Sequence, residues 1–318
     1  MISTQWGKAL EPNIKKYIQD GYNEHPDFTP EIFRVEDDST GIQRYHDSFG
    51  PALIPASSEG AESQEVSISN GYETVTRPKI FKAKMPITEE LNRWNLYKGA
   101  ILDRSTALGS AGIQTINRYA IRPFTQGFST TTTEYGDAKP LFSTLHPRID
   151  GGATISNASS TGDTLTEANL ETAVINLRQQ KSGTGKTLGI GFNENLVLQV
   201  PNNLEKEAVI ITGSTKRSGT PNNDLNWYLG KYSVFVNPFI GSDVTDAEGN
   251  TGSDTAWFLL ARGVHKLQVT WDMHPTFKLW DEESKNTLQT QIYMSLKAFW
   301  WDFRGTWASK GNGLAYSS

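Results

Sequence analysis

The chain has 318 residues, of which 36% are hydrophobic and 20% charged, and its formal net charge is -5. With 28 glycines and 14 prolines, this composition indicates a folded, loop-rich protein and excludes a disordered one. The absence of cysteine excludes disulfides, thiolate metal sites and cysteine nucleophiles, and the mild acidity argues against tight binding to nucleic acid phosphates. No run approaches the ~18 apolar residues of a membrane span and no signal peptide core is present, which favours folding in the cytosol.

The first segment, residues 1–47, is polar and interrupted by prolines. Its apolar positions, such as Ile14, Phe28 and Phe33, are too sparse for a core of their own. We therefore expect an arm that leans on another part of the assembly. A frayed terminus is the alternative, because chain ends are commonly poorly ordered.

Residues 48–84 have the pattern of a projecting β-hairpin. Alternation over 66–68 precedes Asn70 and Gly71, and Tyr72 continues it afterwards. Asn-Gly between alternating runs is a strong signal for a two-residue hairpin turn. An isolated hairpin is marginal in water, so we expect a neighbouring molecule to cover it.

A long helix is predicted from Thr88 to Ile121. Thr88 can cap it, glutamates follow in the first turn, and Pro123 ends it. From residue 95 onward the helix would be roughly 40 Å long, whereas the average helix has about 11 or 12 residues. The alternative is an ordinary core helix broken at Gly99.

The next region, residues 151–263, is predicted to form a mixed α/β domain. Thr164 and Glu167 have the spacing of a capping box, with Thr166 as a competing cap and Gly183 as the helix stop. Apolar runs between turns then predict short buried strands. These strands are Asn195–Val200, Ala208–Thr212, Tyr232–Val236, Ala256–Ala261 and Lys266–Trp271.

The last long element is a strand over Leu288–Trp301. Apolar and polar residues alternate over fourteen positions, which corresponds to roughly 46 Å at ~3.3 Å per residue. Typical strands have about five or six residues. We expect the over-long helix and the over-long strand to share one domain built from distant parts of the sequence, with the α/β domain inserted between them.

The sequence contains no strong motif for catalysis, phosphate binding or metal binding. The run SGTGKT, residues 182–187, resembles a phosphate-binding loop, but Gln180 occupies the first glycine position and a helix precedes it; a turn is the simpler interpretation. The five histidines have no ligand spacing, and no nucleophile with its base is evident. We predict no catalytic, cofactor-binding or metal-binding residue, although spacing alone leaves a glycosidase carboxylate pair open.

Nine tryptophans are unusually many, and six of them lie in the last quarter of the chain. Trp300 and Trp301 are adjacent within the long predicted strand. The tryptophans fit three roles: a sugar-stacking platform, anchors at a subunit interface, or core packing.

Several stretches occur in an order that carries a family resemblance. They are GDAKPLFSTLHP (136–147), LTEANLETAVINLRQQK, LVLQVPNNLEKEA, GTPNNDLN (219–226), VFVNPFI, AWFLL (256–260) and AFWWDFRGTWAS. Over roughly Ser48–Lys310 the chain resembles the major capsid protein of tailed double-stranded-DNA bacteriophages, the Hong Kong 97-type fold. It looks most like the branch of the Mu-like major head subunit.

The resemblance implies an α+β fold with five parts. These are an N-terminal arm (1–47), an extended loop built as a β-hairpin (48–84), a peripheral domain with the spine helix (85–150), an axial domain (151–263) and a return to the peripheral domain (264–318). The expected function is structural. The subunit would self-assemble into hexamers and pentamers of an icosahedral virion shell in the host cytoplasm, enclosing double-stranded DNA without sequence-specific binding.

The resemblance also implies partners: further copies of the chain, a portal, a scaffolding protein and a decoration protein, with no cofactor and no membrane. Contacts between copies are expected at six residues, which are Tyr72, Thr74, Phe28, Phe33, Trp300 and Trp301. The alternatives are an encapsulin-like compartment, which shares the fold, and a carbohydrate-active enzyme or binding module.

Two departures from the family pattern limit what is carried over. The founding member of the fold crosslinks a hairpin lysine to a neighbour's asparagine, but here no lysine lies between Phe49 and Pro78. We therefore predict no isopeptide crosslinking. The chain also begins directly with its arm, so a scaffolding protein is expected to be a separate chain.

Overall fold

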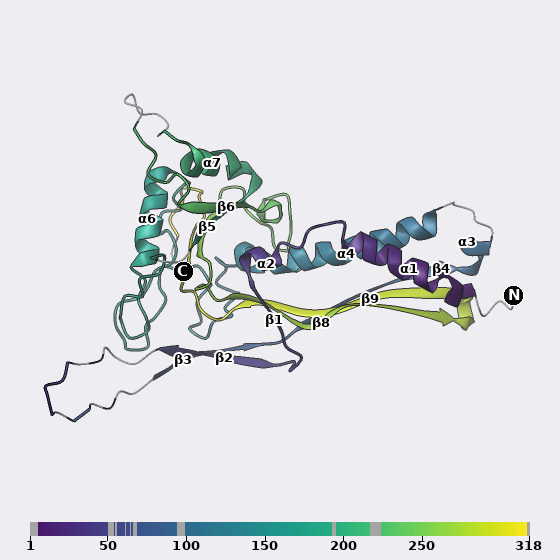
Figure 1. The fold of residues 1–318 in the computed structure, drawn as a ribbon, viewed down its shortest axis with the longest axis horizontal. Helices are drawn as coiled ribbons and strands as arrows, with labels where there is room; N and C mark the ends of the chain where they lie inside the picture. Colours follow the sequence, from purple (N-terminus) through teal and green to yellow (C-terminus); the bar gives the residue numbers. More distant parts are fainter. Residues whose placement is uncertain are drawn as a thin grey trace. The chain divides into compact units, whose positions relative to one another are not determined.

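A computed structural model describes residues 6–49, 54, 56–60, 62–63, 65, 69–93, 99–192, 195–216 and 224–316. The chain forms two compact units (Figure 1). The first unit comprises residues 1–42, 77–120 and 268–298, and the second comprises 43–76, 121–267 and 299–318. Within the described residues, no helix is both long enough and apolar enough to span a membrane.

The first unit is built on a four-stranded sheet in the order β1-β8-β9-β4. Its strands are β1 (Arg34–Asp37), β4 (Lys79–Thr88), β8 (Leu267–Glu282) and β9 (Thr287–Trp300). β4 pairs with β9 in antiparallel register over ten residue pairs, and β1 pairs with the start of β8 in parallel. The long strand predicted over 288–301 is confirmed as β9, within one residue at each end.

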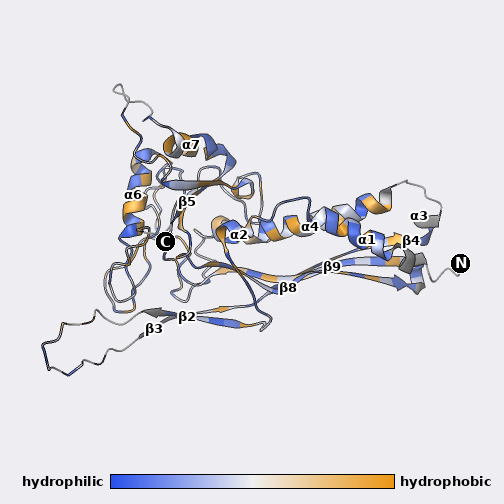
Figure 2. Ribbon diagram, viewed as in Figure 1, coloured by the Kyte–Doolittle hydropathy of each residue, from blue (hydrophilic) through white to orange (hydrophobic). Residues whose placement is uncertain are grey.

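Helices cover one face of this sheet: α1 (Trp6–Tyr22), α2 (Thr29–Ile32), α3 (Glu89–Arg93) and α4 (Ala100–Ala120). α1 runs beside α4, and each carries hydrophobic and hydrophilic residues in turn (Figures 1 and 2). The two helices approach very closely, because a Cβ on Gly109 would overlap the carbonyl oxygen of Ile18. Ile14 and Ile18 are fully buried in a core shared with Ile87 and Leu288. The arm residues Ile14 and Ile18 thus pack against residues of the same chain.

The prediction of one continuous helix from Thr88 to Ile121 is wrong. Gly99 has a φ of 91°, in the left-handed region that glycine tolerates, and α4 begins at the next residue. The break at Gly99 is therefore confirmed, and α4, with 21 residues, is about 30 Å long and not 40 Å. Residues 94–98 lie outside the described residues. Thr88 does cap α3, since its Oγ1 accepts a hydrogen bond from the N–H of Leu91 at 3.2 Å.

The second unit contains a sheet in the order β10-β7-β5-β6. Its strands are β5 (Leu196–Val200), β6 (Tyr232–Val236), β7 (Trp257–Ala261) and β10 (Thr306–Ser309). One face packs against α6 (Glu167–Arg178) and α7 (Glu205–Gly213) through a core that includes Leu170, Leu198 and Trp257. The short helix α5 (Arg122–Thr125) opens this unit's central segment.

Three of the five short strands are confirmed as β5, β6 and β7, and the fifth is the start of the longer β8. The strand predicted over Ala208–Thr212 is wrong, because those residues lie in α7. Thr166 is the N-cap of α6, with its side chain accepting from the N–H of Asn169 at 3.2 Å. The helix ends at Arg178, so Gly183 is not its stop.

The hairpin has a different turn from the one predicted. β2 (Gln43–Phe49) pairs with β3 (Ser69–Thr76) in antiparallel register, and Asn70 lies opposite Ser48. Asn70 and Gly71 are thus inside a strand, and neither has the positive φ that a type I′ turn requires. The connection between the strands is long, and positions 66–68 of the predicted alternation lie outside the described residues.

Candidate functional site

Within the second unit, aromatic contacts fix the base of the β2–β3 hairpin to the residues around it. Tyr45 of β2 stacks on Trp301, with ring centroids 5.7 Å apart and an interplanar angle of 18°. Tyr72 of β3 meets Tyr135 edge-on at 5.5 Å. Gly136 brings its loop against β3, because a Cβ there would overlap the carbonyl oxygen of Glu73. Both strands of the hairpin are therefore held at their base.

A buried group of charges lies beneath the same base. The Arg304 guanidinium donates from Nη1 to Asp47 Oδ2 at 2.8 Å and to Asp302 Oδ1 at 2.9 Å. Its Nε donates to the carbonyl oxygen of Lys181 at 2.9 Å. The Tyr135 hydroxyl donates to Asp47 Oδ2 at 2.8 Å. We call Asp47, Tyr135, Asp302 and Arg304 the hairpin anchor.

The electrostatics of the anchor follow from burial. Burial and the nearby charge of Asp302 raise the pKa of the Asp47 carboxyl, and Arg304 opposes that rise. Burial alone would lower the pKa of the Arg304 guanidinium, but the carboxylates of Asp302 and Asp47 raise it above its ordinary value. Burial also raises the pKa of Tyr135, so its hydroxyl keeps its proton and donates. The anchor therefore stabilises the hairpin only while its cation and carboxylates remain together.

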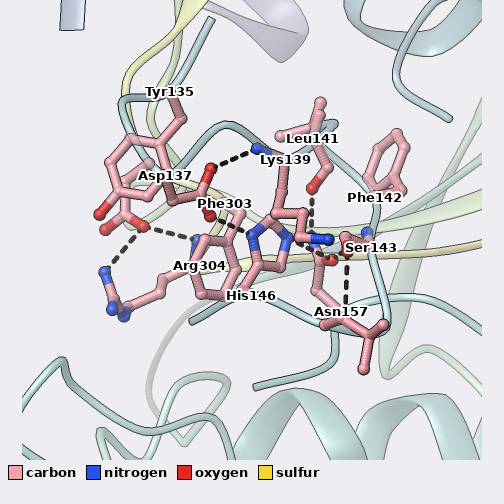
Figure 3. A network of polar contacts seen from close by, with 12 residues as sticks. Tyr135, Asp137, Lys139, Leu141, Phe142, Ser143, His146, Asn157, Phe303 and Arg304 are labelled. Atoms are coloured by element: carbon pink, nitrogen blue, oxygen red, sulfur yellow. Dashed lines mark hydrogen bonds and ion pairs between the residues drawn. The ribbon is translucent and has the colours of Figure 1, made fainter. Parts of the chain in front are cut away.

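A second buried network adjoins the anchor (Figure 3). His146 is completely buried; its Nδ1 lies 2.6 Å from Asp137 Oδ2 and its Nε2 lies 3.1 Å from Asn157 Oδ1. The imidazole ring stacks flat on Phe303, with centroids 3.6 Å apart. Asn157 also accepts from the N–H of Ser143 and donates to the carbonyl oxygen of Leu141. This network ties the loop of residues 135–146 to the segment that carries Arg304.

The six residues expected at subunit contacts differ in how exposed they are. Phe28 and Phe33 lie in the first unit and are 9% and 4% exposed. Thr74 and Trp300 are buried in full or nearly so. Tyr72 and Trp301 are half-buried, which makes them the two of the six with most surface left for a neighbour. Their roles between copies stay predictions.

The tryptophans pack mainly in the core. Of the six in the last quarter, four are at most 5% exposed, namely Trp257, Trp271, Trp300 and Trp307. Trp257 and Trp307 contact each other with ring centroids 4.9 Å apart. These four are therefore core residues, whereas Trp227 and Trp280 are 72% and 40% exposed.

The run resembling a phosphate-binding loop is a tight turn. Lys181 and Thr187 form an antiparallel bridge, and the N–H of Ser182 donates to the carbonyl oxygen of Lys186 at 2.7 Å. The N–H of Lys186 donates to the Ser182 hydroxyl, so the N–H groups of Ser182 and Lys186 are already used within the turn. Within the described parts of the chain, no cluster of three or more His, Asp or Glu could hold a metal ion.

Sequence reasoning missed both buried networks. Asp302 and Arg304 lie within the aromatic-rich run AFWWDFRGTWAS, and charged residues surrounded by aromatic ones are a signal of paired burial. Nothing in the sequence distinguishes His146 from the other four histidines. Its partners Asp137 and Asn157 are nine and eleven residues away, and no local pattern links them.

Comparisons with known proteins agree on the family. The family model of phage capsid proteins matches residues 71–309. No curated protein sequence matches the chain. The mature capsid of bacteriophage PhiM1 is similar in structure, with a TM-score of 0.53 and 11% identity over 87% of this chain and 84% of that chain.

Two further capsids share the fold. The capsid of the native GTA particle has a TM-score of 0.52 and 12% identity over 91% of this chain and 90% of that chain. The bacteriophage JBD30 capsid has a TM-score of 0.50 and 14% identity over 70% of this chain and 94% of that chain. The closer similarity to the Mu-like branch stays a prediction. Because the family model spans most of the sequence, the chain belongs to the phage capsid protein family, and it is a structural subunit of the icosahedral head shell with the Hong Kong 97-type fold.

Proposed function

We propose that this capsid subunit forms the hexamers and pentamers of a shell that encloses double-stranded DNA, and that the β2–β3 hairpin joins neighbouring copies. The observation that carries the proposal is the contrast between the two ends of the hairpin. Its base is fixed by the buried anchor around Arg304, whereas Ile54 beyond it is 86% exposed. A hairpin that is held firmly at its base and exposes an apolar side chain beyond it suits contact with a partner.

Another copy of the chain is the partner that suits this hairpin best. A two-stranded hairpin is marginal alone, and Val75 on β3 is also 47% exposed. A closed shell of one kind of subunit offers each hairpin a neighbouring copy with the same surface residues. Tyr72 and Trp301, with their remaining exposed surface, are the first contacts to test, and Phe28, Phe33, Thr74 and Trp300 follow.

The proposed arrangement keeps the five parts expected from the sequence. Residues 151–263 would meet at the centre of each capsomer as the axial domain, and residues 85–150 and 264–318 would form the peripheral domain. A portal, a scaffolding protein and a decoration protein would be the partners during assembly in the host cytoplasm. The formal net charge of -5 suits a wall that encloses DNA without binding its phosphates tightly.

Assembly of the purified chain tests the proposal. We expect closed particles by electron microscopy for the natural sequence. We expect only open or small oligomers when residues 56–63 are replaced by an equal number of Gly and Ser residues. As a control, Gly and Ser replacement of the exposed loop of residues 149–153, a shorter change, should leave assembly intact. Normal particles from the hairpin variant would refute the role of the hairpin, and particles that enclose an enzyme in place of DNA would support an encapsulin-like compartment.

A further inference from the structure

A small cavity lies between helices α6 and α7 of the second unit. Its volume is about 260 Å³, just below the roughly 300–1,000 Å³ of sites for drug-sized molecules. The start of α6 contributes Leu165, Thr166 and Glu167 to its wall. Since a water-sized group occupies about 30 Å³, the cavity suits a ligand of roughly six to ten non-hydrogen atoms.

Helix α7 gives the cavity one acidic and two aliphatic residues. Glu207, Ile210 and Ile211 line it, and their spacing of three and four residues places them on one face of the helix. Leu165 is 4% exposed and Ile210 is 39% exposed. The aliphatic part of the wall therefore runs from the core to the surface, where a hydrocarbon chain can lie along it.

The neutral polar side chains in the wall are engaged within the protein. Thr166 accepts a hydrogen bond from the N–H of Asn169 as the cap of α6. Asn226 also lines the cavity, and its Nδ2 donates to the carbonyl oxygens of Ile211 at 2.7 Å and Ser214 at 2.8 Å. Its Oδ1 accepts from a backbone N–H. The carboxylates of the two glutamates are therefore the groups best able to recognise a ligand.

These carboxylates select a cation. Glu207 forms no ion pair with any residue that the structure describes, and Glu171 follows Glu167 by one turn of α6, where like charges repel. Within the described residues, no group of three or more His, Asp or Glu could hold a metal ion, and calcium and magnesium prefer about six or more oxygen ligands. An organic cation suits the cavity better, because its hydrocarbon part can cover the aliphatic wall.

We propose that this cavity binds an aliphatic diamine or polyamine, with one ammonium group at Glu167, another at Glu207 and the hydrocarbon chain along the aliphatic wall. The bound amine joins α6 to α7 and offsets the repulsion between Glu167 and Glu171. The site lies within one subunit, so the inference goes beyond the proposed function and does not depend on it.

Titration calorimetry of the unassembled subunit with putrescine, a diaminobutane, tests the proposal. We expect a Kd of about 1 mM at low salt, which two exposed ion pairs and a partly covered hydrocarbon chain support. Butylamine has the same chain and a single ammonium group, so it should bind about fivefold more weakly through the loss of one exposed ion pair. Raising the salt from about 0.05 M to about 0.5 M should weaken the binding of putrescine.

Single substitutions assign the binding to this cavity. Glu167→Gln and Glu207→Gln should each weaken putrescine binding about fivefold. Glu171→Gln and Glu205→Gln are the matched controls, because they make the same charge change on the same helices at exposed positions outside the described lining. Ile210→Thr should also weaken binding, since it removes part of the aliphatic wall. Circular dichroism verifies that each variant folds.

Three results would overturn the proposal. One is the absence of detectable binding at putrescine concentrations up to about tenfold above the expected Kd. Another is equal affinity for butylamine and putrescine, which would indicate a site for a single ammonium group such as a lysine side chain of a partner protein. The third is an equal loss of binding in the control variants, together with displacement of putrescine by equimolar magnesium, which would indicate a diffuse acidic surface.

Discussion

Replacing Arg304 with methionine removes the cation of the hairpin anchor while keeping much of the side-chain volume. The Arg304, Asp47 and Asp302 side chains are 7%, 9% and 8% exposed, so two carboxylates would remain buried without their partner. Breaking a buried ion pair from one side costs about 3–5 kcal/mol. This is a large part of the roughly 5–15 kcal/mol that stabilises a folded domain.

Urea unfolding of the unassembled subunit measures this loss through its midpoint and slope. Arg34→Met is the matched control, because the Arg34–Glu36 pair is 59% and 38% exposed and such surface pairs contribute at most about 1 kcal/mol. Adding Asp47→Asn to Arg304→Met should recover part of the stability, since one buried carboxylate is neutralised. The reasoning is refuted if Arg304→Met costs no more than the control.

Three further predictions concern stability. Burial and neighbouring cations lower the pKa of His265 from 6.5 to about 4. Between these pH values the folded state binds fewer protons than the unfolded state, so the free energy of unfolding should fall as the pH drops. At pH 5 the loss should be about 2 kcal/mol relative to neutral pH. His265→Gln should flatten this part of the pH profile of urea unfolding, and an unchanged slope would contradict the assignment. Gly109→Ala should lower the free energy of unfolding by about 1–3 kcal/mol, and with it the melting temperature, because the added Cβ overlaps the backbone of Ile18. A raised melting temperature would show that α1 does not pack so closely on α4. In the same assay, Thr166→Ala should lower the free energy of unfolding by about 1 kcal/mol, whereas Thr164→Ala should change it little. Equal losses in the two variants would argue against Thr166 as the cap of α6.

Local sequence patterns were sufficient to predict a helix or strand where the residues of that element determine its conformation. The alternation that predicts β9 places Leu288, Ile292 and Met294 in the interior as expected, but the polar positions Gln289, Ser295 and Lys297 are buried as well. The capping residue of α6 was among two candidates that the sequence offered. In both cases the pattern that identifies the element lies within a few neighbouring residues, although the partners of β9 in β4 and α1 are distant in sequence.

Prediction failed where distant segments decide the conformation. The run AVIIT at 208–212 contains β-branched residues that favour strands, yet it lies in α7, whose first turn holds Glu205 and Glu207 as the helix dipole favours. Asn70 and Gly71 were read as a turn because their partner strand, β2, shows no apolar alternation. The buried anchor joins positions 47, 135, 302 and 304, and no pattern in a single stretch of sequence connects them.

The close approach of α1 and α4 has a mechanical consequence. A Cβ at Gly21 would overlap the carbonyl oxygen of Thr106, as one at Gly109 would overlap that of Ile18, so backbone lies on backbone at two points. No layer of side chains is available there to re-pack, and sliding one helix by a single residue would drive larger groups into both points. When neighbouring subunits load the shell, these two helices should bear the force as one rigid strut and not slide past each other.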